Sequence, residues 1–360
     1  GHFHLIPLGQ FQRSGQGVHA LDHHADFLDG IFRGLALADE DTGAVVAAVH
    51  TGSGHDEVAD TGQTCKGVDI AAHRHAQTGD LGDAAGDEGS AGIIAVAEAG
   101  GDADAQRDDV LHGAAQLYTL RDFLKTEPEI AESLKKVKAI GYDAVQISGM
   151  GPIAEEKLAA ICADLGLDIC ATHEGGQMIV EEPERVIERL DKLNCKYTAY
   201  PWPHIIPATR AEAVDLAHRI NASAEKLAAA GKVLCYHNHD IEFMRMEDGS
   251  LILDLFYDNA PALQGEIDTF WVQAGGQNPS CWVRKLSGRM PLLHLKDYGI
   301  HERQRAMFPI GSGNLDWKSI IAEGEAAGVE YFIVEQDVCL KDPFESLADS
   351  FRYLVKNFVK

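Results

Sequence analysis

From about residue 114 to the C-terminus, short apolar runs alternate with longer amphipathic stretches. This alternation predicts parallel strands joined by crossover helices. The predicted strands are Gln116–Thr119, Ala144–Ser148, Asp168–His173, Tyr197–Trp202, Val233–His239, Gly265–Thr269, Leu292–Lys296 and Tyr331–Gln336. The predicted helices are Glu127–Ile140, Ala154–Leu165, Glu182–Leu193, Ala208–Ala230 and Trp317–Ala327. Eight such units are typical of a closed (β/α)8 TIM barrel, an α/β fold.

Local signals agree with these boundaries. Ile130, Leu134 and Val137 lie on one face of the first predicted helix. The stretch Met246–Ser250 predicts a hairpin turn after the fifth strand. An open doubly wound sheet is the alternative architecture. However, no GxGxxG motif opens the first helix, which argues against a dinucleotide-binding fold.

The first 113 residues have a different composition. They contain a single lysine, Lys66, and no tyrosine or tryptophan, and glycine recurs without a helical or strand period. Such a segment buries little apolar area against an ordering cost of about 1–2 kcal/mol per residue. We therefore expect residues 1–113 to be a disordered extension, or the product of GC-rich DNA translated in a non-coding frame. Residues 114–360 are expected to form the barrel domain. The alternative for the extension is a lid over the barrel rim.

The net charge of the chain argues against some classes of binding partner. A net charge of −25 argues against binding to nucleic acid or to anionic membranes. No apolar run approaches the roughly 18–20 residues that span a bilayer, and no secretory signal is visible. Cysteines inside apolar runs, such as Cys235, are interpreted as buried free thiols. We expect a cytoplasmic protein that binds a small molecule, with a homo-oligomer left open.

Polar residues end five of the predicted strands. They are Thr172–Glu174, His237–Asp240 with Glu242 shortly after, Glu266–Asp268, His294–Asp297 and Glu335–Asp337. Active sites of TIM barrels form at this end of the strands. Clustered buried carboxylates and histidines require a cation.

Three of these residues, Asp268, His294 and Glu335, are therefore predicted to bind one metal ion. Mixed oxygen and nitrogen ligands suit Mn²⁺, Mg²⁺, Co²⁺ or Zn²⁺. Asp297 and Asp337 fit helix N-caps better. For Lys296, substrate binding is favoured over an ion pair with Asp297.

The same motifs resemble those of the xylose isomerase-like barrel superfamily of sugar phosphate isomerases, epimerases and inosose dehydratase relatives. The resemblance covers roughly residues 115–358. It rests on Gln116–Arg121, Tyr236–Phe243, Asp268–Val272 with Ala274 and Gly275, His294–Asp297, Gly311–Trp317 and Val334–Asp337.

The resemblance implies a metal held by Glu, Asp, His and Glu from strands five to eight. Three of these four ligands correspond to Asp268, His294 and Glu335 in this sequence. The strand-five position is His237, because His-Asn-His replaces the Glu-Asn-His arrangement of the epimerases. Glu242, further along, is an alternative as a ligand or as an acid/base.

The implied chemistry is proton transfer on a ketose or keto-sugar. A divalent ion stabilises the enediolate that forms when a proton is lost. Glu335 or Glu242, with His237 as a further catalytic candidate, would move that proton. The predicted substrate contacts are Lys296, His239, His173, Trp271, Arg121 and His204. We expect an isomerase or epimerase. The alternatives are a lyase or dehydratase on a keto-glycoside or keto-inositol, and a non-catalytic sugar-binding barrel.

Overall fold

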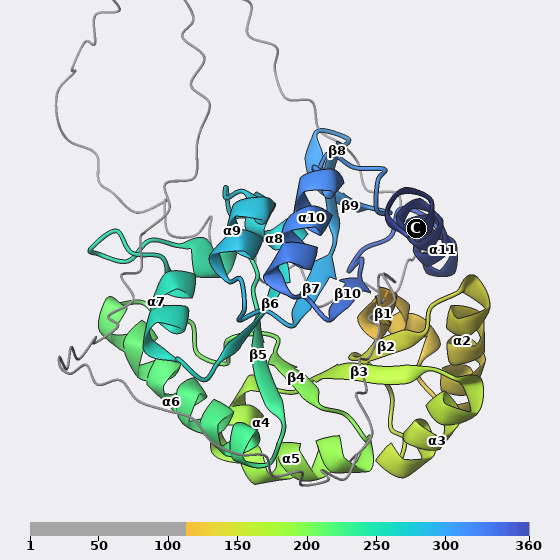
Figure 1. Cartoon of the computed structure of the whole chain (residues 1–360), viewed down its shortest axis with the longest axis horizontal. Helices are drawn as coiled ribbons and strands as arrows, with labels where there is room; N and C mark the ends of the chain where they lie inside the picture. Colours follow the sequence, from red (N-terminus) through yellow and green to blue (C-terminus); the bar gives the residue numbers. More distant parts are fainter. Residues whose placement is uncertain (1–112, 360) are drawn as a thin grey trace, which may run out of the picture. The chain divides into compact units, whose positions relative to one another are not determined.

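Eight parallel strands close into a barrel in the order β1-β10-β7-β6-β5-β4-β3-β2 (Figure 1). The strands are β1 (Gly113–Gln116), β2 (Ala144–Ile147), β3 (Asp168–His173), β4 (Tyr197–Tyr200), β5 (Val233–His237), β6 (Gln264–Asp268), β7 (Leu292–Leu295) and β10 (Tyr331–Val334). This computed structural model describes residues 113–359, and the expectations for residues 1–112 lie outside the described residues. The predicted TIM barrel is confirmed.

Helices follow most of the strands and surround the barrel (Figure 1). The helices are α2 (Glu127–Ile140), α3 (Glu155–Leu165), α4 (Gly176–Glu181), α5 (Pro183–Lys192), α6 (Arg210–Ala229), α7 (Ile252–Asn259), α8 (Thr269–Ala274), α9 (Pro279–Lys285), α10 (Trp317–Ala327) and α11 (Pro343–Phe358). Helices α2 and α10 have the predicted bounds. The pattern did not predict α4, α7, α8 and α9, whose six to eight residues complete too few turns to show a helical period. It also did not predict α11.

The first strand ends earlier than predicted. The side chain of Gln116 accepts a hydrogen bond from the backbone N–H of Tyr118 at 3.2 Å. This contact turns the chain into a 3-10 helix, η2 (Leu117–Phe123), where the strand was expected to continue. The strand prediction for Gln116–Thr119 is therefore shifted by three residues.

A further hairpin follows β7. It pairs β8 (Asp297–His301) with β9 (Gln304–Phe308). Its turn residues Glu302 and Arg303 have φ of 48° and 67°. Glycine or asparagine usually marks such a turn, so this one left no signal in the sequence. The turn at Met246–Ser250 is confirmed, since the N–H of Met246 donates to the carbonyl of Ser250 at 2.8 Å.

The register between β2 and β3 is irregular. Val145 pairs with Ile169, whereas the next residue, Gln146, pairs with Ala171. Cys170 is thus an extra residue on β3, the signature of a β-bulge. Cys170 and Ala171 both belong to the small apolar cluster formed by strand residues alone, although consecutive strand residues normally face opposite sides.

Two further expectations concern the state of the cysteines and the absence of a membrane-spanning segment. Cys162, Cys170, Cys195 and Cys235 are buried free thiols, and Cys339 is a partly exposed one. Within residues 113–359, no helix is long and apolar enough to cross a membrane.

Candidate metal centre

Four predicted ligands converge at the carboxyl ends of neighbouring strands. His237 ends β5, Asp268 ends β6, His294 lies on β7, and Glu335 follows β10. Asp268 and His294 are register partners. One potential ligand atom from each of the four lies within 4.8 Å of the others, and all four side chains are buried.

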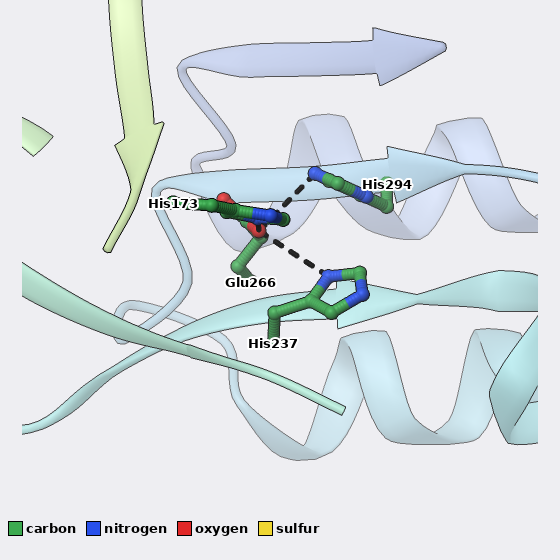
Figure 2. Close-up of side chains that lie close together, drawn as sticks. All are labelled: His173, His237, Glu266 and His294. Atoms are coloured by element: carbon green, nitrogen blue, oxygen red, sulfur yellow. Dashed lines mark hydrogen bonds and ion pairs between the residues drawn. The ribbon is translucent and has the colours of Figure 1, made fainter. Parts of the chain in front are cut away.

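Glu266 lies deeper in the barrel than Asp268. The two residues are two positions apart on β6, so both side chains point to the same face. The Oε1 atom of Glu266 lies 2.6 Å from Nε2 of His173, 3.2 Å from Nδ1 of His237 and 3.1 Å from Nε2 of His294 (Figure 2). These four residues form a second group whose potential ligand atoms lie within 4.8 Å of one another.

The two groups share His237 and His294. His237 directs Nδ1 towards Glu266, and its Nε2 lies 3.9 Å from Oδ2 of Asp268. His294 directs Nε2 towards Glu266, and its Nδ1 lies 2.9 Å from Oε2 of Glu335. Each imidazole therefore offers one nitrogen to each group.

Lys296 is fully buried among the carboxylates. Its Nζ atom lies 2.9 Å from Oδ2 of Asp268, 2.9 Å from Oε2 of Glu335 and 3.1 Å from Oδ1 of Asp337. Asp297 is not among these partners. Burial opposes the charge of Lys296, but Asp268, Asp337 and Glu335 outweigh it and raise the pKa of the ammonium well above its usual range.

Opposing effects set the charges of the ligands. Burial lowers the pKa of His237 to about 4, and the charge on His294 adds to this effect. Burial also opposes a charge on His294, yet Glu266 and Glu335 raise its pKa to about 10. Burial would raise the pKa of Glu335, but Lys296 and His294 hold it well below its usual range. Without metal, the centre therefore holds paired charges.

The two aspartates interpreted as helix caps have other roles. Asp297 accepts hydrogen bonds from the backbone N–H of Gly311 and Gly313 and from Nε1 of Trp317, at 2.8, 2.9 and 2.8 Å. It holds the loop before α10, whereas Asp316 caps that helix. Asp337 pairs with Lys296, and its burial raises its pKa to about 7. The buried ammonium of Lys296 needs the carboxylate of Asp337 more than a helix end does.

An aromatic wall adjoins the centre. The ring of His239 lies 5.1 Å from that of Trp271 and 4.8 Å from that of Trp202. The guanidinium of Arg305 lies 5.7 Å from the Trp271 ring, and its Nη1 pairs with Oδ2 of Asp240 at 2.8 Å. A cavity of about 400 Å³ is lined by Trp271 and by residues of the hairpin β8–β9.

Three other candidates lie in neither ligand group. The buried Glu242 accepts hydrogen bonds from Oη of Tyr236 at 2.9 Å and from the N–H of His239 at 2.7 Å. Burial raises the pKa of Glu242 to about 7. His204 is hydrogen-bonded to Tyr200, and Arg121 donates to the carbonyl of Tyr118 at 3.1 Å.

The sequence interpretation placed Glu266 among the polar residues at the strand ends but gave it no role, and it did not name the side chain of Gln146 as part of the site. Both are completely buried, and the Nε2 of Gln146 donates to Oε2 of Glu266 at 2.7 Å. The two-residue spacing between Glu266 and Asp268 was the available signal, since it places both carboxylates on one face. No comparable signal marked Gln146.

The residues fit a divalent metal. The group of His237, Asp268, His294 and Glu335 offers two nitrogens and two carboxylates, a set suited to Mn²⁺, Co²⁺ or Zn²⁺. The Oδ2 atom of Asp268 is buried and, apart from its ion pair with Lys296, accepts no hydrogen bond. A buried carboxylate oxygen in this state suits a cation.

The comparisons with known proteins agree with this fold. The profile of the xylose isomerase-like TIM barrel family matches residues 134–356. The chain belongs to this family. No match was found among curated proteins.

Solved structures resemble the chain along the barrel. A sugar phosphate isomerase/epimerase from Parabacteroides distasonis has 25% identity and a TM-score of 0.59, covering 69% of this chain and 99% of that one. An L-ribulose 3-epimerase has 19% identity and a TM-score of 0.55, covering 69% and 95%. A probable 3-DHS dehydratase from Bacillus anthracis has 13% identity and a TM-score of 0.55, covering 69% and 99%. The last two show the shared fold alone.

Proposed function

We propose that this protein is a metal-dependent sugar isomerase or epimerase that acts on a ketose or keto-sugar. The observation that carries the proposal is the convergence of His237, Asp268, His294 and Glu335 within 4.8 Å in a barrel of this family. These four residues would hold Mn²⁺, Mg²⁺, Co²⁺ or Zn²⁺. The bound ion would act as a Lewis acid on a substrate carbonyl.

The surrounding residues would move the proton and orient the sugar. Oε2 of Glu335 is occupied by His294 and Lys296, so its other oxygen would remove the proton beside the carbonyl. Lys296 would donate to the oxygen on which negative charge develops. The ring faces of Trp271 and His239 would pack against the sugar.

The remaining candidates would act further from the reacting carbon. His173 would contact the substrate next to the ligand group, and Arg121 and His204 would contact its distal hydroxyls. Glu242 would hold the N–H of His239 and so orient that side chain, rather than transfer the proton itself.

A lyase or dehydratase is the second candidate. Burial raises the pKa of Asp337 to about 7, so this carboxyl is partly protonated near neutral pH and can donate a proton to a departing hydroxyl. Its position beside Lys296, 3.1 Å away, would bring it to the same intermediate.

One experiment separates these reactions. The protein is incubated in D₂O with Mn²⁺ and a panel of ketoses and 3-keto-glycosides, and the products are followed by NMR. Deuterium at a substrate carbon without loss of water supports the isomerase or epimerase, and an unsaturated product indicates the lyase. No exchange on any substrate, together with indifference to EDTA, would favour a non-catalytic sugar-binding barrel.

A further inference from the structure

A directional chain of hydrogen bonds enters the metal centre from β1. It begins at the backbone N–H of Tyr118, which can only donate, and which donates to Oε1 of Gln116 at 3.2 Å. The oxygen of the Gln116 amide is therefore fixed, and its nitrogen must donate elsewhere. That Nε2 atom lies 2.8 Å from Oε1 of Gln146.

The amide of Gln146 is fixed from both sides. Its Oε1 accepts from Gln116, and its Nε2 donates to Oε2 of Glu266 at 2.7 Å. The same Oε1 lies 2.6 Å from Nε2 of His294. Because an amide oxygen only accepts, Nε2 of His294 must carry a proton. Gln116, Gln146 and Glu266 are all fully buried, so no solvent competes for these bonds.

Glu266 also influences which nitrogen carries the proton in His237, the second ligand histidine. Its Oε1 faces Nε2 of His294 at 3.1 Å and Nδ1 of His237 at 3.2 Å (Figure 2). An ionised carboxylate only accepts, so its proximity favours protons on these two inner nitrogens. The contact with Nδ1 of His237 is electrostatic, since that atom forms no hydrogen bond in the metal-free structure. The outer nitrogens are Nδ1 of His294 and Nε2 of His237. In the metal-free centre Nδ1 of His294 also carries a proton, which it donates to Oε2 of Glu335 at 2.9 Å. A metal ion would displace this proton, and both outer nitrogens would then present lone pairs to the ion.

We propose that Glu266, aligned by Gln146, is a positioning residue that sets the tautomers of His237 and His294 for metal binding. This inference rests on the metal centre of the proposed function. Carboxylates that accept the second N–H of a ligand histidine orient the ring and raise its basicity, and losing one typically weakens metal affinity about 10–100-fold.

The test is E266Q, which keeps the size of the side chain. The new amide would still accept from Gln146, so its nitrogen would face Nε2 of His294. The same nitrogen would face Nδ1 of His237, which lies 3.2 Å from Oε1 of Glu266 in the wild type. Two donors would then oppose each other at both histidines. The oxygen of Gln146 still holds the proton on Nε2 of His294, so relief would come at His237, whose proton would move to Nε2, the atom needed by the metal. We expect the Kd for Mn²⁺, measured by calorimetry, to rise about 10–100-fold.

The matched control is E330Q. Glu330 precedes β10 at the opposite end of the barrel, where it accepts from Oη of Tyr197 at 2.7 Å. This variant should bind Mn²⁺ like the wild type. An unchanged Kd in folded E266Q would overturn the inference while leaving the metal centre in place.

A second measurement needs no variant. In Zn²⁺-loaded wild-type protein labelled with ¹⁵N-histidine, NMR should show protons on Nε2 of His294 and Nδ1 of His237. Protons on the opposite nitrogens, or metal on the Glu266 side, would overturn the inference alone. A wild-type protein that binds neither Mn²⁺ nor Zn²⁺ would overturn the metal-dependent function as well.

Discussion

The ammonium of Lys296 lies 2.9 Å from Oδ2 of Asp268, so the lysine that directly follows β7 neutralises a proposed metal ligand at the end of β6. The same ammonium lies 2.9 Å from Oε2 of Glu335, a second proposed ligand. A metal ion and Lys296 would therefore interact with the same two oxygens. The lysine keeps the carboxylates compatible with burial before the ion arrives.

Replacing Lys296 by methionine should destabilise the metal-free protein. Breaking a buried ion pair on one side typically costs about 3–5 kcal/mol, because it leaves uncompensated charge. Mn²⁺ should restore much of the loss by supplying positive charge to the same oxygens. Urea denaturation in EDTA and in Mn²⁺ measures both effects. K285M is the control, since Lys285 forms an exposed pair with Asp254 and its loss should cost at most about 1 kcal/mol. Equal stability of K296M and wild type in EDTA would contradict the prediction.

Replacing Glu335 by glutamine should abolish turnover while the barrel stays folded. The amide keeps the shape of the side chain but has no basicity, and it is a poor metal ligand. Product formation from the substrate found in the D₂O screen measures turnover, and circular dichroism checks the fold. Full activity in E335Q would refute the role of Glu335, and E330Q serves as the control for a Glu-to-Gln change in this barrel.

Glu242 should make stability depend on pH. Burial raises its pKa from 4.5 to about 7 in the folded chain, so the protonated form is favoured by folding. The resulting stability is fully present below pH 4.5 and is lost as pH rises through about 7. A shift of this size corresponds to roughly 3 kcal/mol.

The variant E242Q isolates this effect. Its free energy of unfolding should fall less than that of the wild type between about pH 5 and 8, as measured by urea denaturation at several pH values. Parallel pH profiles for the two proteins would show that Glu242 stays ionised in the fold.

A chain that begins at Gly113 should keep its stability and turnover. The described residues close the barrel by themselves, because β1 starts at Gly113 and pairs with both β2 and β10. Truncation removes residues 1–112, and thermal unfolding and KM are compared with those of the full chain. A lost thermal transition or a large rise in KM would show that the segment completes the fold or acts as a lid.

The barrel could be predicted well from the sequence because each strand and long helix has its own hydrophobic pattern within a short segment. The eight-fold alternation gave the number of barrel strands and the positions of all but the first, which lies three residues earlier than predicted, and helix α2 was predicted with its observed bounds. Short helices such as α8 and the glycine-free turn at Glu302 were missed because neither has a periodic or compositional signal.

The site was predicted less completely for a different reason. The strand-end pattern pointed to Asp268, His294 and Glu335, since it identifies polar residues that interrupt apolar runs. The pairing of Lys296 with three carboxylates, and the orientation of Gln146, depend on contacts across the barrel between residues 28 to 148 positions apart in the sequence. No local pattern encodes such contacts.

The extra residue Cys170 decides which way the end of β3 faces. Side chains on a strand alternate between two faces, so one inserted residue exchanges the faces for everything that follows. Without Cys170, His173 would change places with Thr172, and its imidazole would point towards the surrounding helices instead of Glu266. Whether the number of residues before His173 on β3 is odd or even is therefore as important to the centre as the histidine itself. Deleting one residue from this strand would turn the His173 side chain out of the site, although every residue of the site would still be present in the sequence.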